Sequence, residues 1–514
     1  MNTSHYYEDP EAVTSTEKNI FATPDQDGSD VRGPVELGDE DPRRLSTRRK
    51  WVIILISSLI AHVVTAGSSI YTLAYDQFNT EWRTTRELAT AGLSLYTLAM
   101  GLGPLLVAPL SEFYGRRLIC LWSLVLYLIW LIPCALARNI ETELIGRFFS
   151  GAASSAFLSV AGGTVGDLFD HSQLQTPMLV YSITAFLGPD VGPIFGGFIC
   201  QYTTWRWTFY ALMIWTGVLL ALFYFFSPET YTPLLLRLKT ERLLRQDGLD
   251  VDVKLRPQGL GRTILISCTR PFKLLVLEYM LLSLCILTAF TLGIQYLLFG
   301  GFAYVFRTVY HFELSEIGLT FIGIGVGAVF GLAMDPLWRK YRDKQLKENN
   351  GVPEPEFRLP AVAFGALCLP VSLFFFGWTA RPPVHWIVPI IGSGFFGVGG
   401  LLVYSGIWTF LVEAYPVYAA SALGANAFTR LVAGAAFPLF GVQSWLGVFS
   451  AWFFGAGGGP LPFPAHQVWE TYQRCFKICE IVSIRQIKGS IVTSSLKVPA
   501  MSCVMTAANA QVDS

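Results

Sequence analysis

Charge is scarce in this sequence. Only 14% of the 514 residues are Asp, Glu, Lys or Arg, and 37 basic residues balance 37 acidic ones. A formal net charge of zero gives no electrostatic reason to expect nucleic acid as a partner. Hydrophobic residues make up 52% of the chain and the mean hydropathy is +0.46. A water-soluble protein of this length could not cover so much apolar surface, so we expect the lipid bilayer to be its solvent.

The sequence also lacks a disulfide framework and a recognisable metal site. Its nine cysteines are mostly single residues within apolar stretches, as expected for small hydrophobic packing groups. Cys475 and Cys479 lie four apart, but no cysteine-rich or histidine-rich partner is near them. We therefore expect no metal. The apolar cysteines are Cys120, Cys134, Cys200, Cys285 and Cys368.

Catalytic signatures are missing as well. There is no His-Glu-x-x-His, no Gly-x-Ser-x-Gly and no nucleotide-binding loop of the Gly-Lys-Ser type. The sequence therefore predicts that the protein is not an enzyme and needs no cofactor. Without an ATP site, any uphill process would have to draw on an ion gradient.

Long apolar stretches dominate what is present. A membrane helix needs about 20 mostly apolar residues, and eleven stretches meet that length; a weaker, glycine-broken one near 445–463 makes a twelfth span doubtful. The pattern predicts an all-α membrane protein with twelve transmembrane helices. The clear stretches are 51–75, 89–110, 118–137, 144–168, 178–200, 207–227, 274–306, 314–334, 359–380, 384–411 and 419–442.

Basic residues set the expected orientation, because they collect on the cytoplasmic side of short loops. Five of them precede the first span, Arg116 and Arg117 follow the second, and further groups fall in 228–273 and 335–358. The amino terminus is thus expected in the cytoplasm. The tail 1–50 is polar, has no cleavable signal peptide and is expected to be disordered.

A tight turn between the second and third spans carries the first motif. It runs from Gly103 to Arg117 and places an acid, Glu112, three residues before Gly115-Arg116-Arg117. Glycine permits the turn, and Glu112 can pair with a nearby arginine and the positive end of a helix, which would lock one conformation.

A charge inside an apolar span is the second motif. The fourth span contains Gly146-Arg147-Phe148, and a membrane-buried arginine usually faces a cavity or a partner. A side chain that reaches the membrane surface is the alternative.

The fifth span holds the third motif, Gly188-Pro189-Asp190-Val191-Gly192-Pro193, followed by Gly196 and Gly197. Three of its glycines are four apart and share one helix face, which allows close approach of a neighbouring helix, and the prolines bend the helix. Asp190 points away from that face. We expect it to bind and release a proton, the alternative being a carboxyl at the rim that meets water.

These motifs resemble those of the major facilitator superfamily, in its fungal twelve-span drug:proton antiporter group, with Glu112 where aspartate is usual. The resemblance runs from about residue 51 to Gln443 and departs at 335–339, which lacks a second Gly-Arg-Arg. Flanking stretches narrow the match to multidrug and polyamine exporters: Ser227-Pro228-Glu229-Thr230-Tyr231-Thr232-Pro233, Thr269-Arg270-Pro271-Phe272 and Tyr415-Pro416-Val417-Tyr418-Ala419-Ala420-Ser421-Ala422.

The resemblance implies a fold of two six-helix bundles, 51–227 and 274–463, joined by the cytoplasmic loop 228–273. It implies proton-coupled export of drugs, toxins, secondary metabolites or polyamines by alternating access, with Arg147 in proton transfer. We expect a monomer in the plasma membrane, with the vacuolar membrane as the alternative. Spans one, four, seven and ten would line the substrate cavity, with candidate residues Tyr71, Gln295, Tyr296, Tyr404 and Trp408.

Two alternatives remain. A nutrient-uptake carrier would share the fold, but it would be expected to carry Pro-Glu-Ser-Pro-Arg where this chain has Pro228-Glu229-Thr230-Tyr231-Thr232. The chain after Gln443 is rich in glycine and proline, which are poor in a helix interior. We interpret it as translated out of frame, so that 464–514 is a divergent, disordered tail and the product could be impaired in transport.

Overall fold

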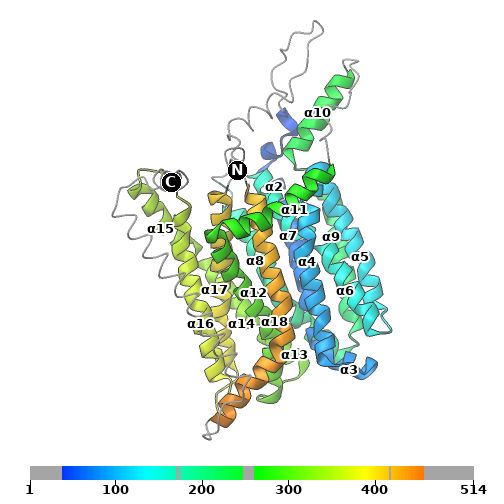
Figure 1. Ribbon diagram of the computed structural model, residues 1–514, viewed down its shortest axis with the longest axis vertical. Coiled ribbons are helices and arrows are strands. Elements are labelled where there is room, and N and C mark those ends of the chain that lie inside the picture. Colours follow the sequence, from blue (N-terminus) through cyan, green and yellow to red (C-terminus); the bar gives the residue numbers. More distant parts are fainter. Residues whose placement is uncertain are drawn as a thin grey trace, which may run out of the picture.

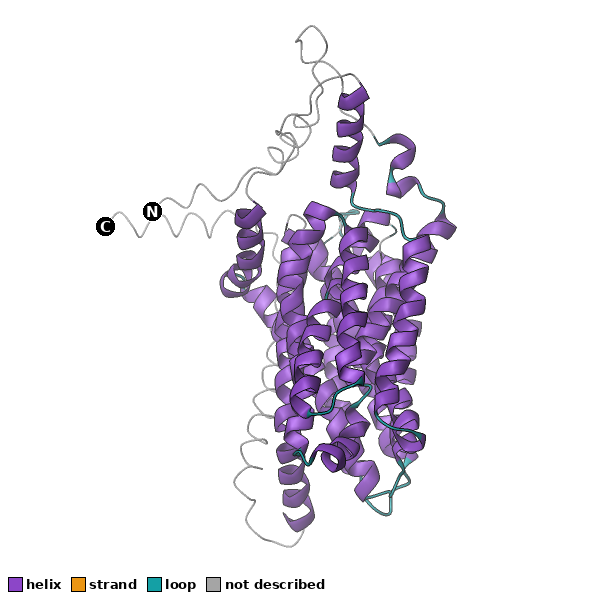
Figure 2. Cartoon of the chain, turned by 90° about the vertical axis from the view of Figure 1, so that its right-hand side faces the viewer, coloured by secondary structure: helices purple, strands orange, loops and turns teal. Residues whose placement is uncertain are grey.

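The computed structural model describes residues 37–169, 173, 175–246, 260–352, 354–415 and 418–455. Within these ranges all regular structure is helical (Figures 1 and 2). Eleven helical segments among them are long and apolar enough to cross a membrane. The prediction of an all-α membrane protein with eleven clear spans is therefore confirmed.

The first half of the chain supplies six spans. Two of them are interrupted: the first continues past its main helix through a 3-10 turn and a short helix, and the fourth is split at Ser155. The elements are α2 (Thr47–Ser69), η4 (Thr72–Ala74), α3 (Tyr75–Trp82), α4 (Arg86–Tyr114), α5 (Arg116–Ala135), α6 (Ile140–Ser154), α7 (Ala156–Leu168), α8 (Gln175–Tyr202) and α9 (Arg206–Phe226).

The second half supplies five described spans. They are preceded by α10 (Thr232–Gln246), which lies in the stretch 228–273 that the sequence assigned to a loop, and by α11 (Leu260–Leu277), which begins in that stretch and runs four residues past its end. The spans are formed by α12 (Tyr279–Thr308), by α13 (Leu314–Thr320), α14 (Ile322–Ala333) and α15 (Asp335–Glu348) in series, by η5 (Pro355–Arg358) with α16 (Leu359–Thr379), by α17 (Ile387–Ala414) and by α18 (Ala419–Gly455).

Polar side chains fix where some of these helices begin. The Thr85 hydroxyl accepts a hydrogen bond from the Leu88 N–H at 3.4 Å, and the Asn139 side chain accepts one from the Thr142 N–H at 3.1 Å. Each bond satisfies an N–H that the first helical turn leaves without a partner. These caps start α4 and α6 at the same end of the molecule.

Burial separates central from peripheral helices. In the span that begins with α2, 83% of the apolar window is buried inside the protein, against 28% in α9. Large apolar side chains such as Ile214 and Phe225 of α9 and Trp378 of α16 are exposed instead. This distribution is expected when lipid, not water, surrounds the outer helices.

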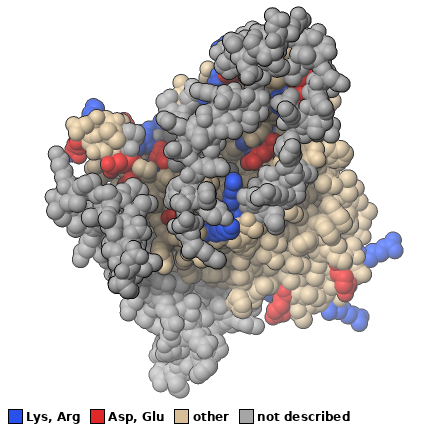
Figure 3. Space-filling model, turned by 45° about the horizontal axis from the view of Figure 1, so that its top comes forward, with Lys and Arg blue, Asp and Glu red and all other residues tan. Residues whose placement is uncertain are grey.

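Figure 1 places α10, α11 and α15 at one end of the molecule and α3 and α13 at the other. We call these the α15 end and the α3 end. Figure 3, which brings the α15 end forward, shows Lys, Arg, Asp and Glu near the ends of the molecule and an uncharged flank between them.

The doubtful twelfth span falls at the edge of the described chain. Through Gly455 the backbone continues α18 as one helix. The remainder of 445–463, like the tail 464–514 with Cys475 and Cys479, lies outside the described residues, as does the tail before Leu37.

Candidate functional site

A buried carboxyl links the two halves near the middle of α8. The Gln295 side-chain amide on α12 donates a hydrogen bond from Nε2 to Oδ2 of Asp190 at 3.0 Å. Asp190 is 1% exposed and Gln295 is fully buried. The other oxygen of each group, Oδ1 of Asp190 and Oε1 of Gln295, has no hydrogen-bond partner in the described part of the chain. This contact joins a candidate proton-binding residue to a candidate cavity residue 105 positions away.

Arg147 holds the end of α2. Its two terminal nitrogens donate to the carbonyl oxygens of Gly67 and Ser68, each at 2.7 Å. The guanidinium lies over the rings of Tyr71 and Tyr96, with Cζ 4.3 Å from each centroid. Arg147 is fully buried, so it does not reach the membrane surface.

α2, which Arg147 holds, also contacts the second half of the chain. The Ser68 hydroxyl and the Tyr296 hydroxyl on α12 are 2.7 Å apart and share a hydrogen bond. Tyr71, by contrast, is held inside the first half, because its hydroxyl donates to the Ala89 carbonyl at 3.2 Å. No hydrogen bond between Arg147 and Asp190 occurs among the described residues. The two reach the second half separately, through Tyr296 and Gln295.

Glu143 is a buried acid that the sequence reasoning missed. It lies one helical turn before Arg147 on α6 and is 1% exposed. Neither of its carboxyl oxygens has a hydrogen-bond partner among the residues that the structure describes. Residues four apart on a helix are neighbours. The signal in the sequence was the pair of opposite charges at this spacing in an apolar segment.

The remaining cavity candidates form an aromatic cluster on α17. The Tyr404 and Trp408 rings are 5.8 Å apart, and the Trp408 indole donates to the Asn426 side chain at 3.2 Å. Arg430 of α18 lies over both rings, with Cζ 5.5 Å from the Tyr404 centroid and 4.8 Å from that of Trp408. The sequence reasoning also missed Arg430, although the rule that singled out Arg147 applies to it equally.

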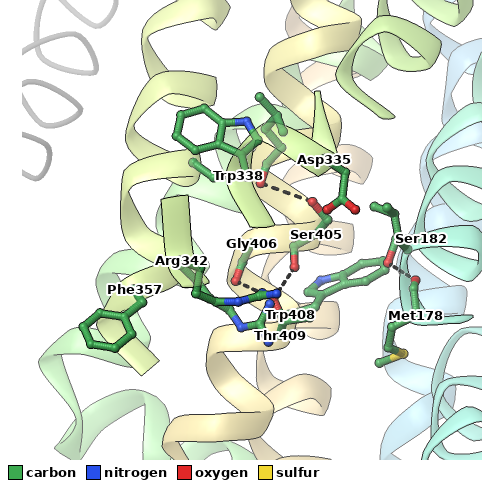
Figure 4. Close-up of a pocket in the computed structure, with 14 residues that line it drawn as sticks. Met178, Ser182, Asp335, Trp338, Arg342, Phe357, Ser405, Gly406, Trp408 and Thr409 are labelled. Carbon is green, nitrogen blue, oxygen red and sulfur yellow. Dashed lines mark hydrogen bonds between the residues drawn. The ribbon is translucent and has the colours of Figure 1, made fainter. Parts of the chain in front are cut away.

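A cavity adjoins this cluster toward the α15 end (Figure 4). It has about 60 Å³ of room for water-sized molecules. α8 contributes Met178 and Ser182, α17 contributes Ser405 and Trp408, and α15 contributes Arg342. The cavity therefore lies between the two halves.

The glycine motif packs α8 against α2. A Cβ atom on Gly188 would lie 1.9 Å from the Thr65 hydroxyl, one on Gly192 would lie 2.2 Å from the Ser69 hydroxyl, and one on Gly196 would lie 1.9 Å from the Ile70 carbonyl oxygen. All are far inside contact distance, so no larger residue fits without moving a helix.

The prolines of the motif also remove a hydrogen bond from within α8. Pro193 has no N–H to give to the Pro189 carbonyl, and the Ser69 hydroxyl of α2 donates to that carbonyl at 2.6 Å instead. The broken helical bond is thus replaced by a bond between helices.

Other glycines bring the two halves together at the α3 end. A Cβ on Gly197 of α8 would lie 2.5 Å from the Leu314 carbonyl oxygen, and a Cβ on Gly318 of α13 would lie 2.6 Å from the Pro193 carbonyl oxygen. Backbone touches backbone here, so the α3 end is closed.

Polar contacts reinforce this closure. Arg307 of α12 pairs with Asp76 of α3, and the Gln201 side chain donates to the Glu313 carboxylate. The side-chain oxygen Oε1 of Gln201 also accepts a hydrogen bond from the Ser315 N–H at 2.8 Å. Each of these contacts crosses from the first half to the second.

The turn motif lies at the α15 end. Gly115 has φ +92°, a conformation that favours glycine, and a Cβ there would lie 2.4 Å from the Glu229 carboxylate. That carboxylate accepts the N–H groups of Arg116 and Arg117 at 3.0 and 3.1 Å, so it caps the start of α5. This contact gives the Pro-Glu-Thr stretch a structural role.

Arg116 pairs with Asp167 of α7, an acid that the sequence reasoning missed. Glu112 is exposed and forms no ion pair with any described residue in this conformation. The Arg117 guanidinium donates to the Tyr224 carbonyl at 2.8 Å. A Cβ on Gly103 would lie 2.0 Å from the Ser155 hydroxyl, so Gly103 allows α4 to approach closely the point where α6 ends and α7 begins.

Across the described ranges, no three His, Cys, Asp or Glu side chains gather in a way that could hold a metal ion. The side chains described above are buried carboxyls, arginines, amides and aromatic rings. These groups can exchange protons, bind charged or aromatic molecules and form different hydrogen bonds in different conformations.

Residues 57–438 match the family described as the Major Facilitator Superfamily. The chain is 44% identical over 416 residues to "Efflux pump atB" of Aspergillus terreus, covering 79% of each chain. It is 39% identical over 428 residues to "Probable drug/proton antiporter YHK8" of Saccharomyces cerevisiae, covering 82% of each. A solved proton:xylose symporter, XylE, is similar in fold, with a TM-score of 0.59 and 17% identity over 80% of this chain and 94% of that one.

Proposed function

Because this chain belongs to the major facilitator superfamily, in the group of fungal efflux pumps and drug:proton antiporters, we propose that it exports small organic molecules in exchange for protons. Its two halves would rock about a site between them, so that the site faces each side of the membrane in turn. The observation that carries the proposal is the hydrogen bond between Asp190 and Gln295 across the halves.

The orientation follows from the basic residues. With the amino terminus and the loops 228–273 and 335–358 in the cytoplasm, the α15 end is the cytoplasmic end. The conformation would then be closed to the outside and nearly closed to the inside. Small-molecule sites typically enclose about 300–1,000 Å³, far more than the cavity beside Trp408, so the halves would have to separate at the α15 end to admit cargo.

Protonation of Asp190 would change the bond between the halves. A protonated carboxyl has an O–H donor, whereas a carboxylate has only acceptors. Its unpartnered Oδ1 could then donate to the unpartnered Oε1 of Gln295, giving two hydrogen bonds in place of one. A proton bound at Asp190 would therefore favour the closed arrangement, and its release would favour separation of the halves.

Arg147 would act on the same interface through α2. It holds the Gly67 and Ser68 carbonyls, and Ser68 in turn binds Tyr296. A change in the contacts of Arg147, for example pairing with Glu143, would release the end of α2. Glu112 and Arg116, at the cytoplasmic end, would control the inward gate without binding cargo.

The test is transport into inside-out membrane vesicles from a yeast that lacks its own exporters. Growth on a panel of toxic compounds first identifies a cargo. The expected result is accumulation of this cargo when the lumen is acidic, and loss of accumulation when a protonophore collapses the gradient. Accumulation that needs ATP, or that persists without the gradient, would contradict the proposal.

A further inference from the structure

Arg430 is a buried cation without a counter-ion among the described residues. It lies in the apolar span of α18 and is 8% exposed. None of the ion pairs among the described residues includes it, and its Nε has no hydrogen-bond partner. A charge buried in a membrane protein is costly unless it is paired. The cost of burying Arg430 is therefore not offset by a carboxylate of the described chain, which suggests that a ligand supplies the negative charge.

Arg147, the other buried arginine in the described ranges, is better compensated than Arg430. Arg147 donates to two carbonyl oxygens and has Glu143 one turn away on its own helix. One turn from Arg430 on either side the chain has Asn426, Ala427, Ala433 and Gly434. The Arg430 guanidinium contacts the side chain of Tyr404 and lies over the faces of Tyr404 and Trp408. A cation over an aromatic ring gains less than one paired with a carboxylate.

The surroundings of Arg430 are held in place. The Asn426 side chain accepts from the Trp408 indole and donates to the Thr288 hydroxyl at 2.7 Å, and the Tyr404 hydroxyl donates to the Thr288 carbonyl at 3.3 Å. These bonds fix the two rings and hence the slot in which the guanidinium lies. Such pre-organisation is typical of a binding site.

Trp408 also lines the cavity between the halves. α8 contributes Met178 and Leu179 to the same lining. Cargo that enters from the α15 end would thus meet apolar side chains of α8 and the Trp408 ring, over which Arg430 lies.

Charge at the cavity mouth is consistent with an anion. Arg342 and Arg358 line the cavity together with a single acid, Asp335. Arg358 pairs with Glu413 and Arg339 pairs with Asp335, whereas Arg342 pairs with no described carboxylate. A cleft lined mostly by one sign of charge concentrates ligands of the opposite sign.

From these observations we infer that the exported cargo is an organic anion, whose carboxylate pairs with Arg430 while its apolar body lies between Trp408 and Met178. The planar fork of arginine binds a carboxylate through two parallel hydrogen bonds. Because the chain's own arginine occupies the faces of Tyr404 and Trp408, a cationic cargo would be repelled there. This inference rests on the proposed export function, since it names the class of cargo.

Three probes with one apolar body test the inference: 1-naphthoate, its methyl ester and 1-naphthylmethylammonium. Their binding is measured by calorimetry on the full-length protein in lipid nanodiscs. We expect the wild type to bind the carboxylate at least about tenfold more tightly than the ester or the ammonium. Arg430→Gln should lose this preference, and Arg430→Lys, which keeps the charge but not the fork, should keep part of it.

The matched control is Arg242→Gln, because the Arg242 side chain on α10 is 69% exposed and lies outside the spans. It should bind all three probes as the wild type does. Equal or tighter binding of the ester or the ammonium by the wild type, no binding of any probe, or an unchanged preference in Arg430→Gln would each overturn the inference. The wild-type comparison does not depend on whether a variant folds.

Vesicle transport separates this inference from the proposed function. Proton-driven uptake of some other cargo, without naphthoate binding, would leave the export function standing and remove the anion site. Naphthoate binding without proton-driven uptake of any cargo would leave the anion site standing and remove the export function.

Discussion

Replacing Gly318 by alanine should open the α3 end. The added Cβ would lie 2.6 Å from the Pro193 carbonyl oxygen and 3.2 Å from the Ile194 Cα, whereas ordinary contact begins at 3.4 Å. The closest contact is about 0.8 Å too short (3.4 minus 2.6), and both neighbours are backbone atoms of α8 that cannot rotate away. The two helices must therefore move apart.

Over-packing of this kind costs about 1–3 kcal/mol. The cost falls only on conformations in which α8 touches α13, so it should shift the equilibrium away from the closed α3 end by about 5-fold to 150-fold. A single cysteine at Thr72, which is buried near that end, should then react faster with a membrane-impermeant maleimide in an otherwise cysteine-free protein. Export should slow, because every cycle passes through the closed arrangement.

Gly377→Ala is the matched control. Gly377 lies on α16 in the same half, and a Cβ there would meet nothing within 4 Å. If Gly318→Ala and Gly377→Ala give the same labelling rate at position 72 and the same export rate, the close contact between α8 and α13 does not govern the closed state.

Three further predictions concern the two ends of the molecule. Asp76→Ala or Arg307→Ala should raise the maleimide labelling rate at position 72 only a few-fold, because both side chains are more than half exposed and exposed pairs contribute about 0–1 kcal/mol. The exchanged pair, Asp76→Arg with Arg307→Asp, should restore the wild-type labelling rate. If this double variant is labelled faster than either single variant, the pairing is refuted. Glu229→Gln should lower the melting temperature of the purified protein, because it removes the negative charge that caps α5 at Arg116 and Arg117; an unchanged melting temperature would show that the cap contributes nothing. Glu112→Ala and Arg116→Ala should each reduce turnover of chemically unrelated cargoes by similar factors, and an altered cargo preference at normal turnover would argue against a gating role.

The sequence was sufficient for those features that local chemistry determines. Each of the eleven spans is a run of apolar residues that can satisfy its backbone only as a helix, and the spacing of Gly188, Gly192 and Gly196 gives a flat face whatever its partner. The turn at Gly115 was likewise predictable, because its glycine and charges are contiguous.

The features that could not be predicted from the sequence are contacts between residues far apart in the chain. Nothing local in the chain indicates that Gln295 binds Asp190, that Asp167 and not Glu112 pairs with Arg116, or that Glu229 caps α5. The rule of a charge in an apolar span could have found Arg430, but its lack of a counter-ion is visible only once the neighbouring helices are in place.

The most direct test of the account is Asp190→Asn in inside-out vesicles. Asparagine keeps the size of the side chain and a hydrogen-bond acceptor for Gln295, but it cannot exchange a proton. We predict that the variant still equilibrates cargo down its concentration gradient, while an acidic lumen no longer drives accumulation. Proton-driven accumulation at the wild-type level in Asp190→Asn would contradict the central claim.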